Sequence, residues 1–138
     1  LGPTELQPAL NRFQNQLNEN SARFARIGVI PEMNHNESVA WGGVGSDQDD
    51  SAIEHVLLLL TWQGMHRQVN KRMDWMVAHA TTDYAWKLAG EGNSLLESLL
   101  HLCILMDWIS LALAFLHGKD PAAIGPISAL KGHLESVQ

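Results

Sequence analysis

Two side chains near the start of the chain have the chemistry of a proton-transfer site. Glu19 lies in the block "QLNEN" and His35 in "EMNHNE". A carboxylate base and a histidine beside an alcohol or ether oxygen suit proton transfer next to a carbonyl group. The plainer alternatives are a solvated helix glutamate and a histidine in a helix-capping turn. Spacing along the sequence does not tell whether the two side chains meet.

Other common kinds of chemical site find little support. The seven histidines contain no pair at spacing i, i+3 or i, i+4, so we expect no metal site. The stretch "GGVG" is not a phosphate loop, because no strand precedes it and no Lys-Ser/Thr follows it. No segment has the pattern of a nucleophile elbow. We therefore expect no cofactor.

The composition is that of a mildly acidic globular domain. The 138 residues, 46% hydrophobic and 17% charged, suit one domain spanning residues 1–138. The net charge is −6 and the basic residues form no run, so we expect neither nucleic acid nor a membrane surface as partner. Cys103, within "HLCILMDW", is expected to be a buried, reduced thiol of a cytoplasmic protein.

Hydrophobic periodicity indicates which elements carry the polar cluster. The pattern predicts a helix over residues 4–27, with Gly28 as its C-cap. Its apolar residues recur at helical spacings: Leu6, Leu10, Phe13, Leu17 and Phe24. A short helix in "NHNESVAW" and an acidic loop over residues 42–50 follow. The run "IEHVLLLLTW" predicts a strand buried on both faces of a parallel sheet.

The second half repeats the alternation of helix and strand. Residues 64–80 predict a helix, residues 82–89 a weaker strand, and residues 95–116 a long buried helix started by Asn93 or Ser94. Charged residues within that long apolar segment favour a buried helix over a membrane span. A turn at Asp120-Pro121 precedes a final helix. This order predicts an α/β fold, a three-layer α/β/α domain with a small parallel sheet.

Several blocks resemble one family. The stretch "QLNENSARFARIGVIPEMNHNESVAW" is similar to the start of the C-terminal sugar-isomerase (SIS) domain of bifunctional phosphoglucose/phosphomannose isomerases. That family shows a Gln-x-Asn-Glu-Asn block, an apolar-Pro-Glu-x-Asn stretch, then His-Asn-Glu and a Trp. The stretch "GNSLLESLLHLCILMDWISLALAFLHGKDPAAIGPISALKGHL" resembles the family's long helix, Gly-x-Asp-Pro turn and last helix. The resemblance covers nearly the whole chain.

The resemblance implies aldose–ketose isomerisation of hexose 6-phosphates through a cis-enediol. By position, Glu19 would move the proton between C1 and C2 of the sugar. His35 would assist ring opening in the neighbouring subunit's site, so a homodimer with a shared active site is implied, and Lys131 would act at the ring oxygen. Asn36 and Glu37 complete the motif, either by touching substrate or by fixing the turn.

Two departures from the family pattern leave alternatives open. The family's threonine, seven positions before the lysine and tied to mannose 6-phosphate, is Ile124 here, and its Asp-Pro-Thr ends in Ala122. The family's phosphoryl group is held mainly by an N-terminal SIS domain absent from this chain, so we expect a fragment that is inactive by itself. The parent is either a working isomerase, or an inactive SIS protein used for sugar-phosphate sensing or dimer assembly.

Overall fold

The chain folds into a layered α/β domain. The computed structural model describes residues 1–44 and 50–135, so the middle of the predicted acidic loop lies outside the described residues. In chain order the elements are β1 (Gly2–Pro3), the 3-10 helix η1 (Thr4–Leu6), α1 (Gln7–Ser21), β2 (Val29–Ile30), the 3-10 helix η2 (Glu32–His35), α2 (Glu37–Trp41), β3 (Leu57–Trp62), α3 (Arg67–His79), β4 (Ala85–Gly90), α4 (Leu95–Leu116) and α5 (Gly125–Glu135).

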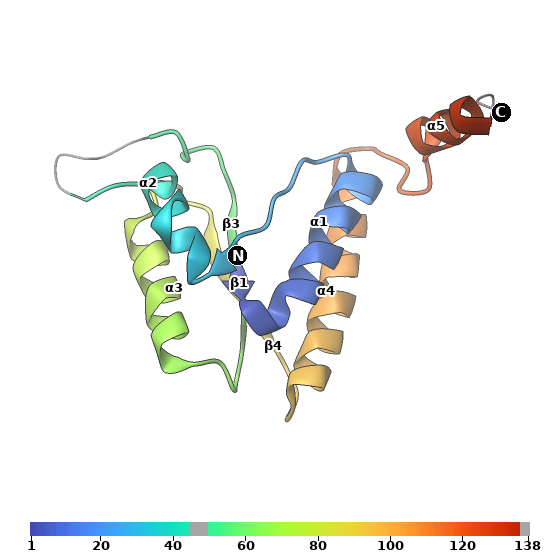
Figure 1. Cartoon of the computed structure of the whole chain (residues 1–138). Coiled ribbons are helices and arrows are strands. Elements are labelled where there is room, and N and C mark those ends of the chain that lie inside the picture. Colours follow the sequence, from blue (N-terminus) through green and yellow to red (C-terminus); the bar gives the residue numbers. More distant parts are fainter. Residues whose placement is uncertain (45–49, 136–138) are drawn as a thin grey trace.

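The strands form two small parallel sheets of two strands each, which hydrogen bonds join into one layer between two helical layers. β1 pairs with β2 and β3 pairs with β4, both in parallel. Two hydrogen bonds join the pairs: the Leu1 nitrogen donates to Leu58 O at 2.5 Å, and the Leu60 amide donates to Leu1 O at 2.8 Å. Helices α1 and α4 lie on one side of the strands and α2 and α3 on the other (Figure 1). The predicted α/β/α fold is confirmed.

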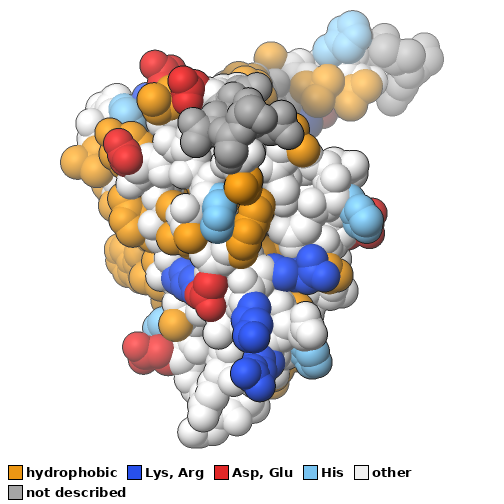
Figure 2. Space-filling model, turned by 90° about the vertical axis from the view of Figure 1, so that its left-hand side faces the viewer, with side chains coloured by type: hydrophobic (Ala, Val, Ile, Leu, Met, Phe, Trp, Pro, Cys, Tyr) orange, Lys and Arg blue, Asp and Glu red, His pale blue; other side chains and the backbone are white. Residues whose placement is uncertain are grey.

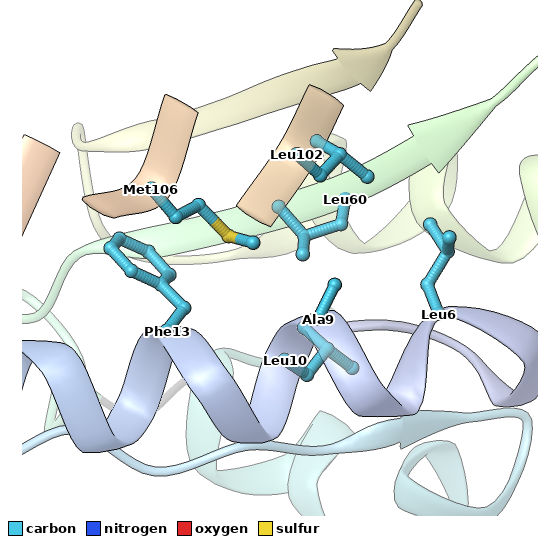
Figure 3. Packing of buried hydrophobic residues seen from close by; sticks show 7 residues of the cluster. All are labelled: Leu6, Ala9, Leu10, Phe13, Leu60, Leu102 and Met106. Atoms are coloured by element: carbon cyan, nitrogen blue, oxygen red, sulfur yellow. The ribbon is translucent and has the colours of Figure 1, made fainter. Parts of the chain in front are cut away.

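Strand β3 separates two hydrophobic clusters, because successive side chains of a strand point to opposite faces. Leu60 packs with α1 and α4, whereas Leu57 and Leu59 pack with α3 and the segment around η2. Figure 3 shows the first cluster, which consists of Leu6, Ala9, Leu10, Phe13, Leu60, Leu102 and Met106. The second consists of Ile30, Met33, Leu57, Leu59, Met73 and Met76. The predicted strand "HVLLLLTW", buried on both faces, is confirmed over Leu57–Trp62.

The first helix is shorter than predicted. It ends at Ser21 rather than residue 27, because Ala22 adopts the left-handed conformation (φ 52°) and its amide donates to Leu17 O. Gly28 is therefore not the C-cap. Phe24, whose spacing fitted the helical pattern, is fully exposed in the following segment. Its match to the helical periodicity was accidental. The segment after Ser21 is not helical and connects α1 to β2.

The long helix α4 begins as predicted and is buried on one side only. Ser94 is its N-cap, and a reciprocal capping box with Glu97 satisfies the amides of both residues. Its buried residues follow at every fourth position, where they face α1 and the sheet: Ser98, Leu102, Met106, Ser110 and Ala114. The prediction of a buried helix was therefore wrong for its outer face. Cys103, predicted to be buried, is partly exposed between the two faces.

The outer face of α4 carries large apolar side chains that no other part of residues 1–44 and 50–135 covers. Its exposed members are Leu96, Leu100, Ile104, Trp108, Phe115 and Leu116. Among the described residues, α4 is the one helix whose length and mean hydropathy of 2.1 would suffice to cross a membrane. Those two properties also occur in core helices, and α4 packs on α1 with an ion pair between Arg12 and Asp107 at 2.6 Å.

Candidate functional site

Glu19 lies on the last turn of α1 with its side chain exposed to solvent. The asparagines on either side of it hold the end of the helix in place. Asn18 Oδ1 accepts from the Ala25 amide at 3.0 Å, and Asn20 Nδ2 donates to Ser110 Oγ of α4 at 2.8 Å. No described hydrogen bond or ion pair engages the Glu19 carboxylate. The two asparagines of the block "NEN" thus fix the end of the helix and leave the Glu19 carboxylate available to a ligand.

His35 ends η2 on the opposite side of the sheet. It is exposed and lines a hollow of about 300 Å³ together with Pro31, Glu32, Asn34 and Arg72. Buried Met33, which packs against β3 and α3, fixes the 3-10 turn that presents this histidine. The ring is therefore positioned by a well-packed turn and remains accessible to a ligand.

Asn36 and Glu37 belong to the turn between η2 and α2. The Asn36 amide donates to Met33 O at 3.2 Å, and its side chain makes no capping hydrogen bond. Glu37 Oε1 accepts from Arg26 Nη2 at 2.6 Å, and the carboxylate is mostly buried. The Arg26–Glu37 pair ties the segment after α1 to the start of α2. Of the two roles left open for Glu37, the geometry favours fixing the turn.

Lys131 and Ile124 lie at the far end of the chain, away from the other predicted site residues. Lys131 is on α5, all of whose residues are exposed, and α5 stands clear of the layered body in Figure 1. Ile124 directly precedes α5 and is 39% exposed. The Asp120 carboxylate accepts from the Ala122 amide at 2.9 Å, which forms the predicted Asp-Pro turn.

The predicted catalytic residues do not meet within one chain. Glu19 is on the side of the sheet covered by α1 and α4, His35 is on the side covered by α2 and α3, and α5 carries Lys131 away from both (Figure 1). Neither described hollow contains more than one of the three residues. Any site that uses all three needs a second chain or a further domain to bring them together.

Sequence reasoning missed a group of basic and polar residues on α3. A second hollow of about 380 Å³ adjoins the one at His35 and lies between α3 and the η2–α2 segment. Its lining residues are Asn34, Ser38, Gln68, Lys71, Arg72 and Trp75. The signal was present in the sequence, because Gln68, Lys71, Arg72 and Trp75 recur at helical spacing opposite the buried Met73 and Met76.

Over residues 1–44 and 50–135, no group of three or more His, Cys, Asp or Glu residues is arranged to hold a metal ion. His101 of α4 accepts through Nδ1 from the Glu91 amide at 3.2 Å. This contact links α4 to the loop that leaves β4.

Comparisons with known proteins agree with the fold. The family described as "Bacterial phospho-glucose isomerase C-terminal SIS domain" matches residues 1–134. A bifunctional phosphoglucose/phosphomannose isomerase of Aquifex aeolicus is 35% identical over 127 residues, covering 90% of this chain and 38% of the relative. One of Caldicellulosiruptor bescii is 30% identical over 139 residues, covering 99% of this chain and 39% of the relative. One of Thermoplasma acidophilum is 22% identical over 130 residues.

The layered fold, with a small parallel sheet between helical pairs, defines an SIS-type α/β domain. Within that class, the chain belongs to the family of bacterial phosphoglucose isomerase C-terminal SIS domains. It spans 38% to 39% of the length of the curated relatives that it matches.

Proposed function

We propose that the chain is the C-terminal SIS domain of a cytoplasmic hexose 6-phosphate isomerase that interconverts glucose 6-phosphate and fructose 6-phosphate through a cis-enediol. The observation that carries this proposal is the family match over residues 1–134. The resemblance of "QLNEN" and "EMNHNE" to the family's blocks assigns the catalytic positions to Glu19 and His35. In this proposal residues 1–138 form one domain of a longer protein with two SIS domains. The share of the relatives' length that the chain covers supports that arrangement.

The roles follow from the chemistry of each group. The Glu19 carboxylate removes the proton from C2 of the open-chain aldose and returns it to C1 of the enediol, which gives the ketose. A glutamate with no ion pair or hydrogen bond to the described residues suits this role, because no ion pair among them has to break before it accepts the proton. His35 and Lys131 act at the ring oxygen during ring opening, which precedes proton abstraction.

The proposal requires a homodimer, or a second domain, that brings His35 to the site of Glu19. Support comes from the placement of the two residues on opposite sides of the sheet, which keeps them apart within one chain (Figure 1). Closed two-fold dimers are the commonest way in which one chain supplies a group to another chain's site.

A second candidate is an SIS protein without activity that binds sugar phosphates or assembles dimers. Ile124 and Ala122 favour it, because neither side chain offers the hydroxyl that the family pattern has at its place. A buried substrate hydroxyl left without a partner costs about 1–3 kcal/mol. If the protein is instead an active isomerase, Ile124 in place of the family's threonine makes mannose 6-phosphate a poorer substrate than glucose 6-phosphate.

Glu19→Gln in the full-length protein tests the proposal. Glutamine keeps the shape and can hydrogen-bond, but it cannot accept the proton, so solvent deuterium exchange into fructose 6-phosphate should fall about 10²–10⁴-fold. Sugar-phosphate binding should be nearly unchanged. Glu54→Gln, at an exposed site on the loop before β3, is the matched control and should leave exchange intact.

Wild-type exchange in Glu19→Gln would make Glu19 an ordinary solvated residue. A full-length protein that binds hexose phosphates without any exchange would favour the second candidate. The 138-residue chain alone should be inactive, because remote binding energy from the phosphoryl group contributes to turnover as well as to affinity.

A further inference from the structure

The cleft between α3 and the η2–α2 segment has features of a ligand site that the proposed roles leave unused. It consists of two adjoining hollows, of about 380 and 300 Å³, which share Asn34 and Arg72 as lining residues. Figure 2 looks onto this side of the molecule and shows Lys and Arg side chains gathered in its lower half. We name the hollow with Lys71 and Trp75 the basic hollow, and the hollow with His35 the histidine hollow.

The basic hollow concentrates positive charge without a matching carboxylate. Lys71 and Arg72 both line it, and its lining set contains no Asp or Glu. Three other basic residues of the described chain have acidic partners: Arg12 pairs with Asp107, Arg26 with Glu37 and Lys87 with Asp74. No described ion pair or hydrogen bond engages Lys71 or Arg72. Two adjacent cations repel each other, and a phosphoryl group would relieve that repulsion with charge-assisted hydrogen bonds.

Asn34, which lines both hollows, has an unsatisfied buried atom. Its Oδ1 is buried without a hydrogen-bond partner, and its Nδ2 has only a long contact of 3.4 Å to Ser38 Oγ. A buried acceptor without a donor is costly and uncommon. Lysine and arginine attract an anion, whereas this carbonyl oxygen needs a donor. A ligand that carries both a phosphoryl group and hydroxyls meets both requirements.

The histidine hollow is suited to hydroxyls rather than to a second anion. Glu32 and His35 line it beside Arg72 and Asn34. The Glu32 carboxylate would repel a phosphoryl group, but it accepts hydrogen bonds from hydroxyls. In the basic hollow, Trp75 is 42% exposed and stacks on His79 with ring centroids 4.4 Å apart, which adds an apolar wall.

We propose that this cleft binds a small sugar phosphate, with the phosphoryl group at Lys71 and Arg72 and the hydroxyls at Asn34, Glu32 and His35. The inference goes beyond the proposed function and rests on it only for the choice of a hexose phosphate as ligand. The cleft would thereby be a binding site of this chain apart from the site at which Glu19 acts, and it does not replace the phosphoryl contacts that turnover needs from another domain.

Titration of the isotopically labelled chain with inorganic phosphate, fructose 6-phosphate and fructose, followed by amide NMR, tests the inference. Phosphate and fructose 6-phosphate should shift the amides of η2, α2 and α3 in a saturable way, with dissociation constants in the millimolar range, roughly 1 mM. Fructose should bind much more weakly. The double variant Lys71→Ala/Arg72→Ala should weaken phosphate binding at least about tenfold.

Arg67→Ala is the matched control, because Arg67 is an exposed cation of the same helix that lines neither hollow. It should keep wild-type affinity, and circular dichroism should show that all variants fold. An equal loss with Arg67→Ala would mean diffuse attraction to the helix and would overturn the inference. Absence of saturable shifts with phosphate and fructose 6-phosphate would overturn it as well.

Asn34→Ala separates the two ends of the site. It should weaken fructose 6-phosphate binding several-fold, because a hydroxyl loses its acceptor, while inorganic phosphate binding stays unchanged. Equal effects on both ligands would overturn the assigned orientation. These are binding measurements on the chain alone, so their failure leaves the Glu19 exchange experiment untouched, and the reverse also holds.

Discussion

At the scale of single residues, the end of α1 shows how polar neighbours prepare one side chain for chemistry. Asn18 holds the chain that follows the helix, and Asn20 holds α1 to Ser110 of α4. Glu19 between them stays exposed. A carboxylate placed in this way keeps a defined position without an ion pair that would compete with its substrate.

His35→Ala in the full-length protein should separate ring opening from proton transfer. Turnover of cyclic glucose 6-phosphate should fall about 10²-fold or more, because the group that assists ring opening is lost. Deuterium exchange into the open-chain sugar should fall much less. His117→Ala, at an exposed histidine beyond α4, is the control. Equal losses for the cyclic and the open-chain form would contradict the assigned role.

Cys103 should react slowly with thiol reagents at neutral pH. Burial is the main cause that raises the pKa of its thiol, and Asp107 raises it further against the opposing effect of Arg12. Because the thiolate is the reactive form, a raised pKa lowers its fraction at pH 7. Alkylation by iodoacetamide should be slower in the folded chain than in the urea-unfolded chain, and should accelerate with rising pH. Equal rates in both states would refute this.

At the scale of elements, α4 packs closely on β4 as well as on α1. A Cβ added at Gly90, the last residue of β4, would lie 2.7 Å from Ser98 O and 2.9 Å from Ser98 Cβ. Glycine is thus required here for close approach of a strand and a helix, where it faces the small residue Ser98.

Gly90→Ala should destabilise the chain by about 1–3 kcal/mol, because the methyl group must push α4 away from β4. Urea unfolding followed by circular dichroism measures the change. Gly132→Ala on α5 is the matched control, since nothing lies within 4 Å of its added Cβ. There alanine should be neutral or slightly stabilising through its helix propensity, by no more than about 1 kcal/mol. Equal destabilisation by both changes would contradict the close-packing argument.

At the scale of the whole molecule, the isolated chain exposes more apolar surface than a monomeric protein usually does. The outer face of α4 includes Leu100 at 56%, Ile104 at 60% and Trp108 at 68% exposure. Helix α5, which stands clear of the layered body in Figure 1, adds the exposed side chains of Ile127, Leu130 and Leu134. In the proposed arrangement, a second copy or a further domain would bury these faces.

The isolated chain should therefore self-associate at micromolar concentration. Leu100→Glu combined with Ile104→Glu should abolish this association, because it places two charges in the middle of the outer face of α4. Val39→Glu, at a 71% exposed site on α2, is the control and should not change it. Sedimentation velocity measures the outcome, and a wild-type chain that stays monomeric would contradict the prediction.

The sequence by itself determined the family, the central strand and the start of α4. A continuous apolar run and a Ser-x-x-Glu capping box are local signals, so β3 and the Ser94 cap were predictable. The end of α1 was not predictable, because the left-handed turn at Ala22 leaves no mark in the hydrophobic pattern and exposed Phe24 imitated its continuation.

Only the tertiary structure decided which polar residues come together. Hydrophobic periodicity indicates which face of an element is buried. It does not indicate which other element lies next to the polar face. It therefore could not show that Glu19 and His35 lie on opposite sides of the sheet, or that α4 is buried along one stripe. Arg72 on α3 lines the same cleft as Asn34 and His35, although α3 and η2 are far apart in sequence. That juxtaposition depends on packing of α3 and η2 against the same face of β3, which no local pattern encodes.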